Sequence, residues 1–326
     1  MNTITATNLS KTFEYYQKDV GIKSALRNLF HREKLYKQAL KDFSFTVSEG
    51  EILGLIGANG AGKTTLIKLL SGILYPTEGG AEVLGFTPWE RKNAFKHQIG
   101  VVMAQKTQLW WDLPAIDSFE VNRYIYELSD AEYRRNIDEL ITLFHVEKLQ
   151  KVQVRRLSLG ERMKFEIIAS LLHNPKVIFL DEPTIGLDVV AQRDMRRFIL
   201  EYRKNHHATI LVTSHYMQDI DELCNRAVVL NHGTIVYDGS IAAMKELPYR
   251  TLVVHHDEHL LPSAIKERWA ITSLNNGSFQ MRLQEEEIKP CISALIDAGI
   301  INFNFVEANI EERVIDLLEQ GGGVSS

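Results

Sequence analysis

The segment that most constrains this 326-residue chain is a glycine-rich loop between an apolar run and a helix-like run. Its sequence, GANGAGKT over residues 57–64, matches the pattern G-x-x-x-x-G-K-[ST]. Glycines let the backbone curl so that successive N–H groups face phosphate oxygens, at the positive end of the following helix dipole. The lysine can reach the β- and γ-phosphates, and the final hydroxyl can ligate Mg²⁺. The loop therefore predicts a nucleotide phosphate site, formed by Gly57, Asn59, Gly60, Ala61, Gly62, Lys63, Thr64 and Thr65.

A pair of carboxylates, Asp181 and Glu182, follows a second apolar run, VIFL. In nucleoside triphosphatases a carboxylate at a strand end holds Mg²⁺, often through water. We therefore expect Asp181 and Thr64 to share the metal. The adjacent Glu182 is in a position to orient and deprotonate the water that attacks the terminal phosphate.

The order of the apolar runs predicts an α/β fold. Strand-like runs occupy residues 51–56, 177–180 and 208–215. Helix-like stretches separate them, which favours a mostly parallel sheet with helices on its faces. The carboxyl ends of parallel strands form one ligand-binding edge, so His215, which ends the third run, is expected there. A helical subdomain is expected over about 112–175. Residues 227–239 alternate apolar and polar positions around the turn NHG, which predicts a hairpin closing a first domain, 1–246.

A second, smaller domain is predicted beyond Pro248. Its segments are strands at 251–256, 270–274, 279–283 and 301–306, with helices near 258–268 and 285–298. Their order is that of a ferredoxin-like split βαββαβ unit. We expect an accessory or regulatory α+β domain over 249–320, followed by a disordered tail, 321–326.

The motif LSLGE, residues 157–161, lies between the phosphate loop and Asp181. Lys63 and Asp181 are 118 positions apart, a gap too long for a compact nucleotide kinase. Ser158 and Glu161 have the spacing of a capping box, in which each side chain bonds an otherwise unpaired amide of a first helical turn. Besides starting a helix, this turn has a glycine and free N–H groups, which suit a phosphate brought by another subunit.

With these motifs together, the sequence resembles the ATP-binding subunits of ABC transporters over about residues 1–240. The resemblance implies a P-loop NTPase fold of the ABC type. The matching segments are the Walker A loop 57–65, the Q-loop residue Gln105, the signature 157–161, the Walker B strand 177–182 with its catalytic glutamate, the D-loop 186–188 and the switch histidine His215. Gln105 is preferred to Gln108 because Leu109 and Leu113 then fall where the Q-loop of the family has them.

The resemblance also implies roles for these residues. Gln105 would ligate Mg²⁺ and report the γ-phosphate to the helical subdomain, and His215 would touch the γ-phosphate and polarise the attacking water. The family stacks adenine on an aromatic residue near the first strand. We predict Phe13 for this role, and Tyr15 and Tyr16 are the alternatives.

The resemblance further implies a head-to-tail homodimer that holds each ATP between the Walker A loop of one subunit and the signature of the other. Ser158 and Gly160 would then contact nucleotide bound to the other subunit, and Asp188 of the D-loop would also belong to the nucleotide-binding residues. Two positions depart from the usual LSGGQ signature, because Leu159 replaces a glycine and Glu161 replaces the glutamine. LSLGE and the QLWWDLP stretch of the Q-loop segment resemble the exporter branch described as ABC-2 transporters.

The expected function is that of an ATPase subunit that uses ATP and Mg²⁺ to power a separate integral membrane permease, most simply an exporter. The net charge of −5 gives no general attraction for nucleic acid, and no run of 18 apolar residues or signal-peptide pattern occurs. We expect a cytoplasmic protein, peripheral on the inner face of the cell membrane, that contacts neither nucleic acid nor the transported substrate. The alternative is a soluble ABC ATPase that acts on ribosomes or DNA.

Residues 17–41 are interpreted as a basic insertion between the first strand and a strand at 43–47. They contain seven Lys or Arg and two acidic residues, a formal charge of +5. The spacing of one helix face is shared by Ile22, Ala25, Leu26, Leu29 and Phe30. This pattern predicts a short basic amphipathic helix that docks on the permease or on anionic lipid, or else packs on the protein's own sheet.

Overall fold

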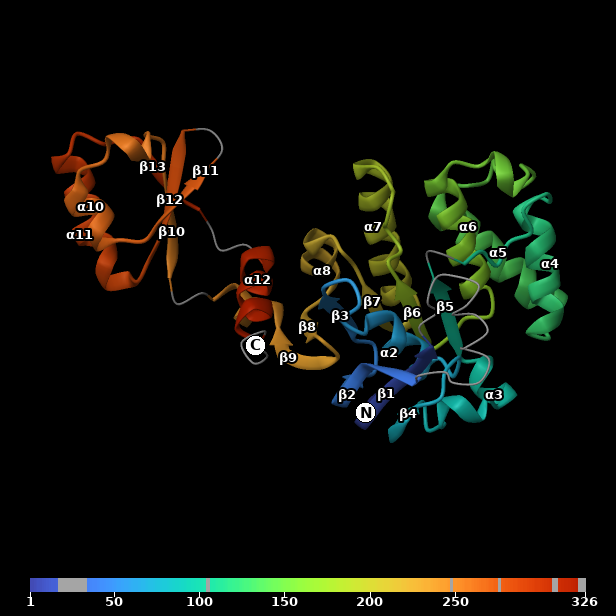
Figure 1. Cartoon of the computed structure of the whole chain (residues 1–326). Helices are drawn as coiled ribbons and strands as arrows, with labels where there is room; N and C mark the ends of the chain where they lie inside the picture. Colours follow the sequence, from blue (N-terminus) through green and yellow to red (C-terminus); the bar gives the residue numbers. More distant parts are fainter. Residues whose placement is uncertain (17–33, 104–105, 247–248, 275–276, 307–309, 322–326) are drawn as a thin grey trace, which may run out of the picture. The chain divides into compact units, whose positions relative to one another are not determined.

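The computed structural model describes residues 1–16, 34–103, 106–246, 249–274, 277–306 and 310–321 (Figure 1). The chain forms two compact units, Met1–Gly239 with Leu317–Ser326, and Ser240–Asp316. The division therefore lies a few residues before the expected boundary at residue 246. There the Ser240 hydroxyl accepts a hydrogen bond from the Ala243 amide at 3.0 Å and starts a new helix.

The first unit is built on a six-stranded sheet of order β5-β6-β7-β3-β8-β9, in which the neighbours from β5 to β8 run parallel. A second, antiparallel sheet has the order β2-β1-β4. The strands are β1 (Asn2–Tyr16), β2 (Lys34–Ser48), β3 (Ile52–Gly57), β4 (Glu78–Val83), β5 (Ile99–Met103), β6 (Val177–Asp181), β7 (Thr209–Thr213), β8 (Arg226–Asn231) and β9 (Thr234–Ser240). The predicted parallel sheet is confirmed, so the ends of β3, β6 and β7 meet at one edge.

The helices of this unit are α2 (Lys63–Leu70), α3 (Asn93–Lys96), α4 (Ala115–Ile125), α5 (Asp130–Phe144), α6 (Leu159–Leu171), α7 (Val189–His206) and α8 (Met217–Leu223). Helices α4 and α5 both pack against α6 and form a helical subdomain (Figure 1). Ser129 and Ser158 start α5 and α6 with complete capping boxes. The capping box predicted for Ser158 is therefore confirmed.

The hairpin predicted over residues 227–239 is also confirmed, as β8 and β9. Its turn residues, His232 and Gly233, have φ of 45° and 82°, the left-handed values that a two-residue type I′ turn requires. The Gly233 amide donates to the Ala61 carbonyl at 3.0 Å. The hairpin turn therefore supports the phosphate loop from one side.

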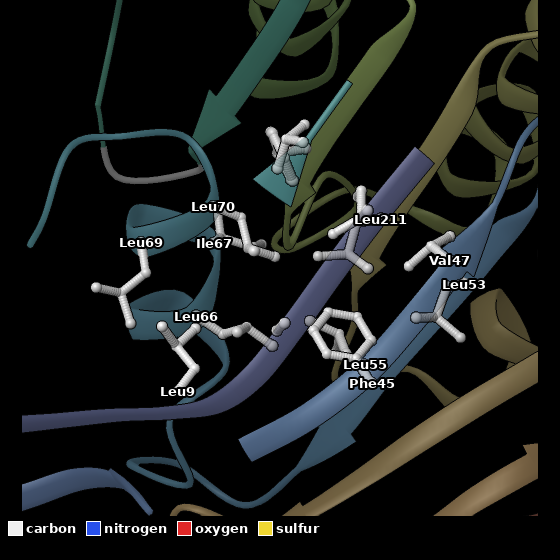
Figure 2. Close-up of a cluster of buried hydrophobic side chains, with 14 of the residues drawn as sticks. Leu9, Phe45, Val47, Leu53, Leu55, Leu66, Ile67, Leu69, Leu70 and Leu211 are labelled. Carbon is white, nitrogen blue, oxygen red and sulfur yellow. The ribbon is translucent and has the colours of Figure 1, made fainter. Parts of the chain in front are cut away.

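A hydrophobic core joins the two sheets to α2, the helix that follows the phosphate loop. Figure 2 shows side chains from β1, β2, β3, β7 and α2 in one cluster, at most 5% exposed: Leu9, Phe45, Val47, Leu53, Leu55, Leu66, Ile67, Leu69, Leu70 and Leu211. Burial of these side chains is the main force that fixes α2 on the sheet. The start of α2, and with it the phosphate loop, is therefore held in place.

The first two strands are longer than the sequence suggested, with 15 residues each. They pair along their whole length, and the last pair is Tyr16 with Lys34. Residues 34–41 are thus strand, not part of an insertion, and the expected strand at 43–47 covers only the last third of β2. The predicted amphipathic helix falls on residues 17–33, which lie outside the described residues.

The second unit has the predicted split βαββαβ topology. Its antiparallel sheet has the order β11-β12-β10-β13, and the core includes Leu252, Phe279, Met281 and Cys291. The elements are α9 (Ile241–Lys245), β10 (Arg250–Val254), α10 (Ser263–Arg268), β11 (Ile271–Leu274), β12 (Ser278–Leu283), α11 (Glu285–Asp297) and β13 (Phe303–Val306). One expected helix is shorter, because residues 258–260 form only a 3₁₀ turn before Pro262, which lacks the N–H that a continuous helix needs.

The last helix, α12 (Ile310–Gly321), crosses the division between the units. The sequence assigned all of this helix to the accessory domain. Its final turn groups instead with the first unit, where the Leu318 carbonyl accepts a hydrogen bond from the Asn231 side-chain amide at 2.9 Å. Residues 322–326, within the expected tail, lie outside the described residues.

Candidate functional site

The phosphate loop joins β3 to α2 and lies directly against β2. At Gly62 φ is +113°, and a Cβ atom there would approach the Ala39 carbonyl oxygen to 2.6 Å. At Gly60 φ is +82°, with open space around the missing Cβ. Glycine at 62 is thus required both by backbone conformation and by the close approach of β2.

Lys63 is folded back onto this loop. Its ammonium group donates to the carbonyls of Gly57 at 2.7 Å and Ala58 at 3.3 Å, and the residue is 5% exposed. Burial lowers the pKa of the Lys63 ammonium, while the nearby Glu182 and Asp181 oppose that shift. The cation therefore lies at the centre of the loop, in contact with the carbonyls that precede it.

Asp181, at the end of β6, is held by two hydroxyl groups. One carboxylate oxygen accepts from Thr64 and the other accepts from Thr213, each at 2.8 Å. Thr64 belongs to the first turn of α2 and Thr213 ends β7. Thr213 was missed by sequence reasoning, although a hydroxyl at a strand end was the available signal. These bonds fix the carboxylate beside the phosphate loop.

Glu182 has a backbone conformation that is rare for residues other than glycine, with φ of +58°. Its amide donates to the Thr213 hydroxyl at 3.0 Å, which holds the backbone in this conformation. Its carboxylate lies 2.7 Å from Nε2 of His215 and is 19% exposed. The two residues are thus in direct contact, and the carboxylate remains open to solvent.

An open cavity lies in front of the phosphate loop. It is lined by Phe13 and Lys37, by Glu182, and by loop and helix residues that include Asn59, Gly60, Ala61, Gly62, Lys63, Thr64 and Thr65. Phe13 and Lys37 are cross-strand partners in β1 and β2. Tyr15 and Tyr16 stand farther along β1, about half exposed, and do not line this cavity. Sequence reasoning missed Lys37, because only the strand register brings it here.

The signature and D-loop residues line a different cavity. It includes Ser158, Gly160 and Asp188, together with Leu159 and Gly186, and none of the phosphate-loop residues lines it. Asp188 also caps α7, since its carboxylate accepts from the Ala191 amide at 2.8 Å. The structure therefore separates Ser158, Gly160 and Asp188 from the phosphate loop of the same chain.

Gln105, the predicted Q-loop glutamine, lies outside the described residues, whereas the alternative Gln108 is described. The side-chain amide of Gln108 donates to the Val101 carbonyl at 3.0 Å, and its backbone amide donates to Glu166 at 2.9 Å. Glu166, in α6, is 5% exposed and also accepts from the Thr107 hydroxyl. Burial raises the pKa of this carboxyl group. Sequence reasoning missed Glu166, although an acidic residue in the apolar run FEIIASLL was a signal.

Comparison with known proteins agrees with this geometry. Residues 40–185 match the protein family described as ABC transporter. The ABC transporter ATP-binding protein NatA of Bacillus subtilis is 32% identical over 217 residues, which are 67% of this chain and 88% of that protein. This chain belongs to the ABC transporter ATP-binding proteins. It is an ATPase that binds ATP, and proteins of this family work with membrane permease subunits and dimerise.

Two further relatives align over most of the chain. The bacitracin transport ATP-binding protein BcrA of Bacillus licheniformis is 28% identical over 86% of this chain and 90% of its own. The methionine import ATP-binding protein MetN 2 of Enterococcus faecalis is 27% identical over 84% of this chain and 82% of its own. Within the described residues, none of the helices has the length and apolar character needed to cross a membrane.

Solved structures show the same fold. An ATP-binding subunit of an ABC transporter superposes with a TM-score of 0.61 at 24% identity, covering 74% of this chain and 92% of that one. A dimeric ATP-binding cassette in a post-hydrolysis state, bound to ADP and Pi, also has a TM-score of 0.61, at 21% identity, and covers 73% of this chain and 98% of its own. The ABC-type P-loop fold expected from the sequence is therefore confirmed.

Replacing Gly62 with alanine should weaken ATP binding at least about tenfold, because the new Cβ would collide with β2 and displace the loop. Binding of a fluorescent ATP analogue measures the effect. Gly85→Ala is the matched control: Gly85 also has positive φ, +80°, but open space around its missing Cβ and no place in the cavity. Equal affinity in the two variants would contradict the proposed close approach.

Proposed function

We propose that this chain is the ATP-hydrolysing subunit of an ABC-2 type exporter, peripheral on the cytoplasmic face of the membrane, where it drives a separate integral permease. The contact of Glu182 with His215, beside a complete phosphate loop, carries the hydrolytic part of the proposal. The LSLGE signature and the bacitracin transport relative support the exporter part. The methionine import relative represents the opposite direction of transport.

ATP would bind with its phosphates against the loop amides and its adenine on Phe13. Lys63 would exchange the loop carbonyls for β- and γ-phosphate oxygens. Lys37, which also lines the cavity, would add a second positive charge near the nucleotide. Binding therefore uses both sheets of the first unit.

The residues around Asp181 fit Mg²⁺. The Thr64 hydroxyl, which lines the cavity, and the Asp181 carboxylate are hard oxygen donors that lie 2.8 Å apart. Thr64 and Asp181, with Gln105, would hold the ion. When bound, Mg²⁺ neutralises phosphate charge.

Glu182 is proposed as the general base. Its partly exposed carboxylate would accept a proton from the water that attacks the γ-phosphate. His215, 2.7 Å away, would keep that carboxylate in place and contact the phosphate. The neighbouring Asp181, whose carboxylate accepts hydrogen bonds from Thr64 and Thr213, would instead hold the metal. The two acidic residues would therefore have separate roles.

The second cavity supports a head-to-tail homodimer. Ser158, Gly160 and Asp188 lie there, away from the phosphate loop of their own chain. Val189 and Val190, in the same cavity wall, are 76% and 58% exposed. An apolar rim of this kind favours burial against a second copy of the chain. Each ATP would then be held between two subunits.

The helical subdomain is proposed to face the permease. Trp110 and Trp111, at its edge, are 51% and 48% exposed, and the Arg162 guanidinium lies 5.3 Å from the Trp111 ring centroid. Exposed tryptophans are frequent anchors of protein interfaces. The transported substrate would contact the permease and not this chain.

Affinity purification of the tagged chain from detergent-solubilised membranes should recover an integral membrane protein with it. The reason is the exposed tryptophan pair, so a Trp110→Ala, Trp111→Ala variant should recover less of that protein. Mass spectrometry of the eluates identifies the membrane protein and compares its amount between the wild-type chain and the variant. Recovery of ribosomes instead would support the alternative of a soluble ABC ATPase.

Glu182→Gln should reduce steady-state ATP hydrolysis at least about 100-fold, because the amide cannot accept the proton of the attacking water. ATP binding should persist, and the ATP-bound dimer should accumulate in size-exclusion chromatography. The amide has nearly the same shape, so the phosphate cavity is preserved. A near wild-type turnover rate would exclude Glu182 as the base.

Ser158→Arg should reduce hydrolysis about 100-fold without loss of ATP binding to the monomer, because the long side chain would block the phosphate that the other subunit presents. Ser129→Arg is the matched control. Both serines cap helices with the same capping box, so both variants lose about 0.5–2 kcal/mol of capping stability. Equal hydrolysis rates in the two variants would refute the composite site.

A further inference from the structure

Asp219, in α8, is a buried carboxylate that the family motifs do not include. The residue is 1% exposed. One of its oxygens accepts from the Ser214 hydroxyl at 2.6 Å and from the Thr184 hydroxyl. The other accepts from the Arg196 guanidinium at 2.7 Å. A single side chain thus binds two loops and one helix.

The two hydroxyl groups belong to the loops that carry Glu182 and His215. Thr184 follows Glu182 by two positions, and Ser214 directly precedes His215. The Ser214 hydroxyl also accepts from the Tyr216 amide at 3.0 Å, so it closes the turn that contains His215. Both hydroxyl-bearing residues are at most 2% exposed. Movement of either loop would therefore break a buried hydrogen bond.

Arg196, in α7, supplies the charge that makes this buried carboxylate tolerable. Its side chain is 3% exposed, and a second nitrogen bonds the Glu222 carboxylate at 2.7 Å. Glu222 is 42% exposed and also accepts from the Gln218 side chain. The two acidic partners of Arg196 therefore differ: Asp219 binds the catalytic loops, and Glu222 faces solvent.

We infer that Asp219 is a positioning residue for ATP hydrolysis, which holds the Glu182 loop and the His215 loop at the spacing where the two side chains meet. The inference rests on the roles proposed above for Glu182 and His215. Asp219 does not line the cavity at the phosphate loop, so it acts only through the two loops. Its loss should change the rate of hydrolysis and not the affinity for ATP.

The test compares Asp219→Asn with Glu222→Gln in the full chain. The asparagine side chain has nearly the same shape as the aspartate, but it offers one acceptor oxygen to three donors. We expect kcat to fall about tenfold or more, with ATP affinity within about twofold of wild type. Glu222→Gln also removes one ion pair of Arg196 but touches neither loop, so its kcat should stay within about twofold. Unchanged kcat in Asp219→Asn, or an equal loss in Glu222→Gln, would overturn the inference.

A second pair of variants covers the case in which Asp219→Asn does not fold. Thr184→Val removes the hydroxyl that binds Asp219, and Thr184→Ser keeps it. We expect kcat to fall about fivefold or more in the first and to remain near wild type in the second. Equal rates in both variants would overturn the inference. Failure of the proposed catalytic roles is separately visible, as near wild-type turnover in Glu182→Gln.

Discussion

The carboxylate of Asp181, at the end of β6, joins that strand to the end of β7 and to the start of α2, and the site depends on this junction. Its hydrogen bond with Thr64 holds the start of α2, the helix that follows β3 and the phosphate loop. Its hydrogen bond with Thr213 holds the end of β7. Its own strand, β6, lies beside β7 in the parallel sheet. Because parallel strands place their carboxyl ends on one edge, three segments far apart in the sequence meet there. The phosphate loop, Asp181 and Glu182, the residues proposed to bind phosphate, to hold the metal and to act as the base, are therefore parts of one hydrogen-bonded structure.

The signature helix is connected to other functional segments by contacts within the same chain. The buried Glu166 of α6 accepts hydrogen bonds from the Thr107 hydroxyl and the Gln108 backbone amide, in the segment that follows Gln105. At the start of the same helix, Leu159 packs over Gly186, where any Cβ would lie 2.8 Å from a leucine methyl. Leu159, which replaces the usual signature glycine, therefore fits here because Gly186 has no side chain. Movement of the signature would therefore involve both the Q-loop segment and the D-loop.

Some parts of this structure are determined by short stretches of sequence. The phosphate loop, the capping box at Ser158 and the turn at His232 each depend on residues within a few positions of one another. Local backbone sterics and local hydrogen bonds decide such features, so the residue pattern is enough to predict them. The βαββαβ order of the second unit was predictable for a similar reason, because strand and helix periodicities change along the chain.

Other parts were decided only by the tertiary structure. In the sequence Lys37 is one of several basic residues of the predicted insertion, and only the register of β1 and β2 places it beside Phe13 at the cavity in front of the phosphate loop. Thr213, Glu166 and Asp219 acquire their roles from partners 32, 59 and 35 positions away. Sequence patterns report which residues share a face of one helix or strand, but not which faces meet. The sequence by itself therefore determined the phosphate-loop motif, the order of helices and strands along the second unit and the pair of carboxylates that follows β6. The packing of strands from distant segments decided which hydroxyl groups, cations and buried acids contact these segments or line the cavity beside them.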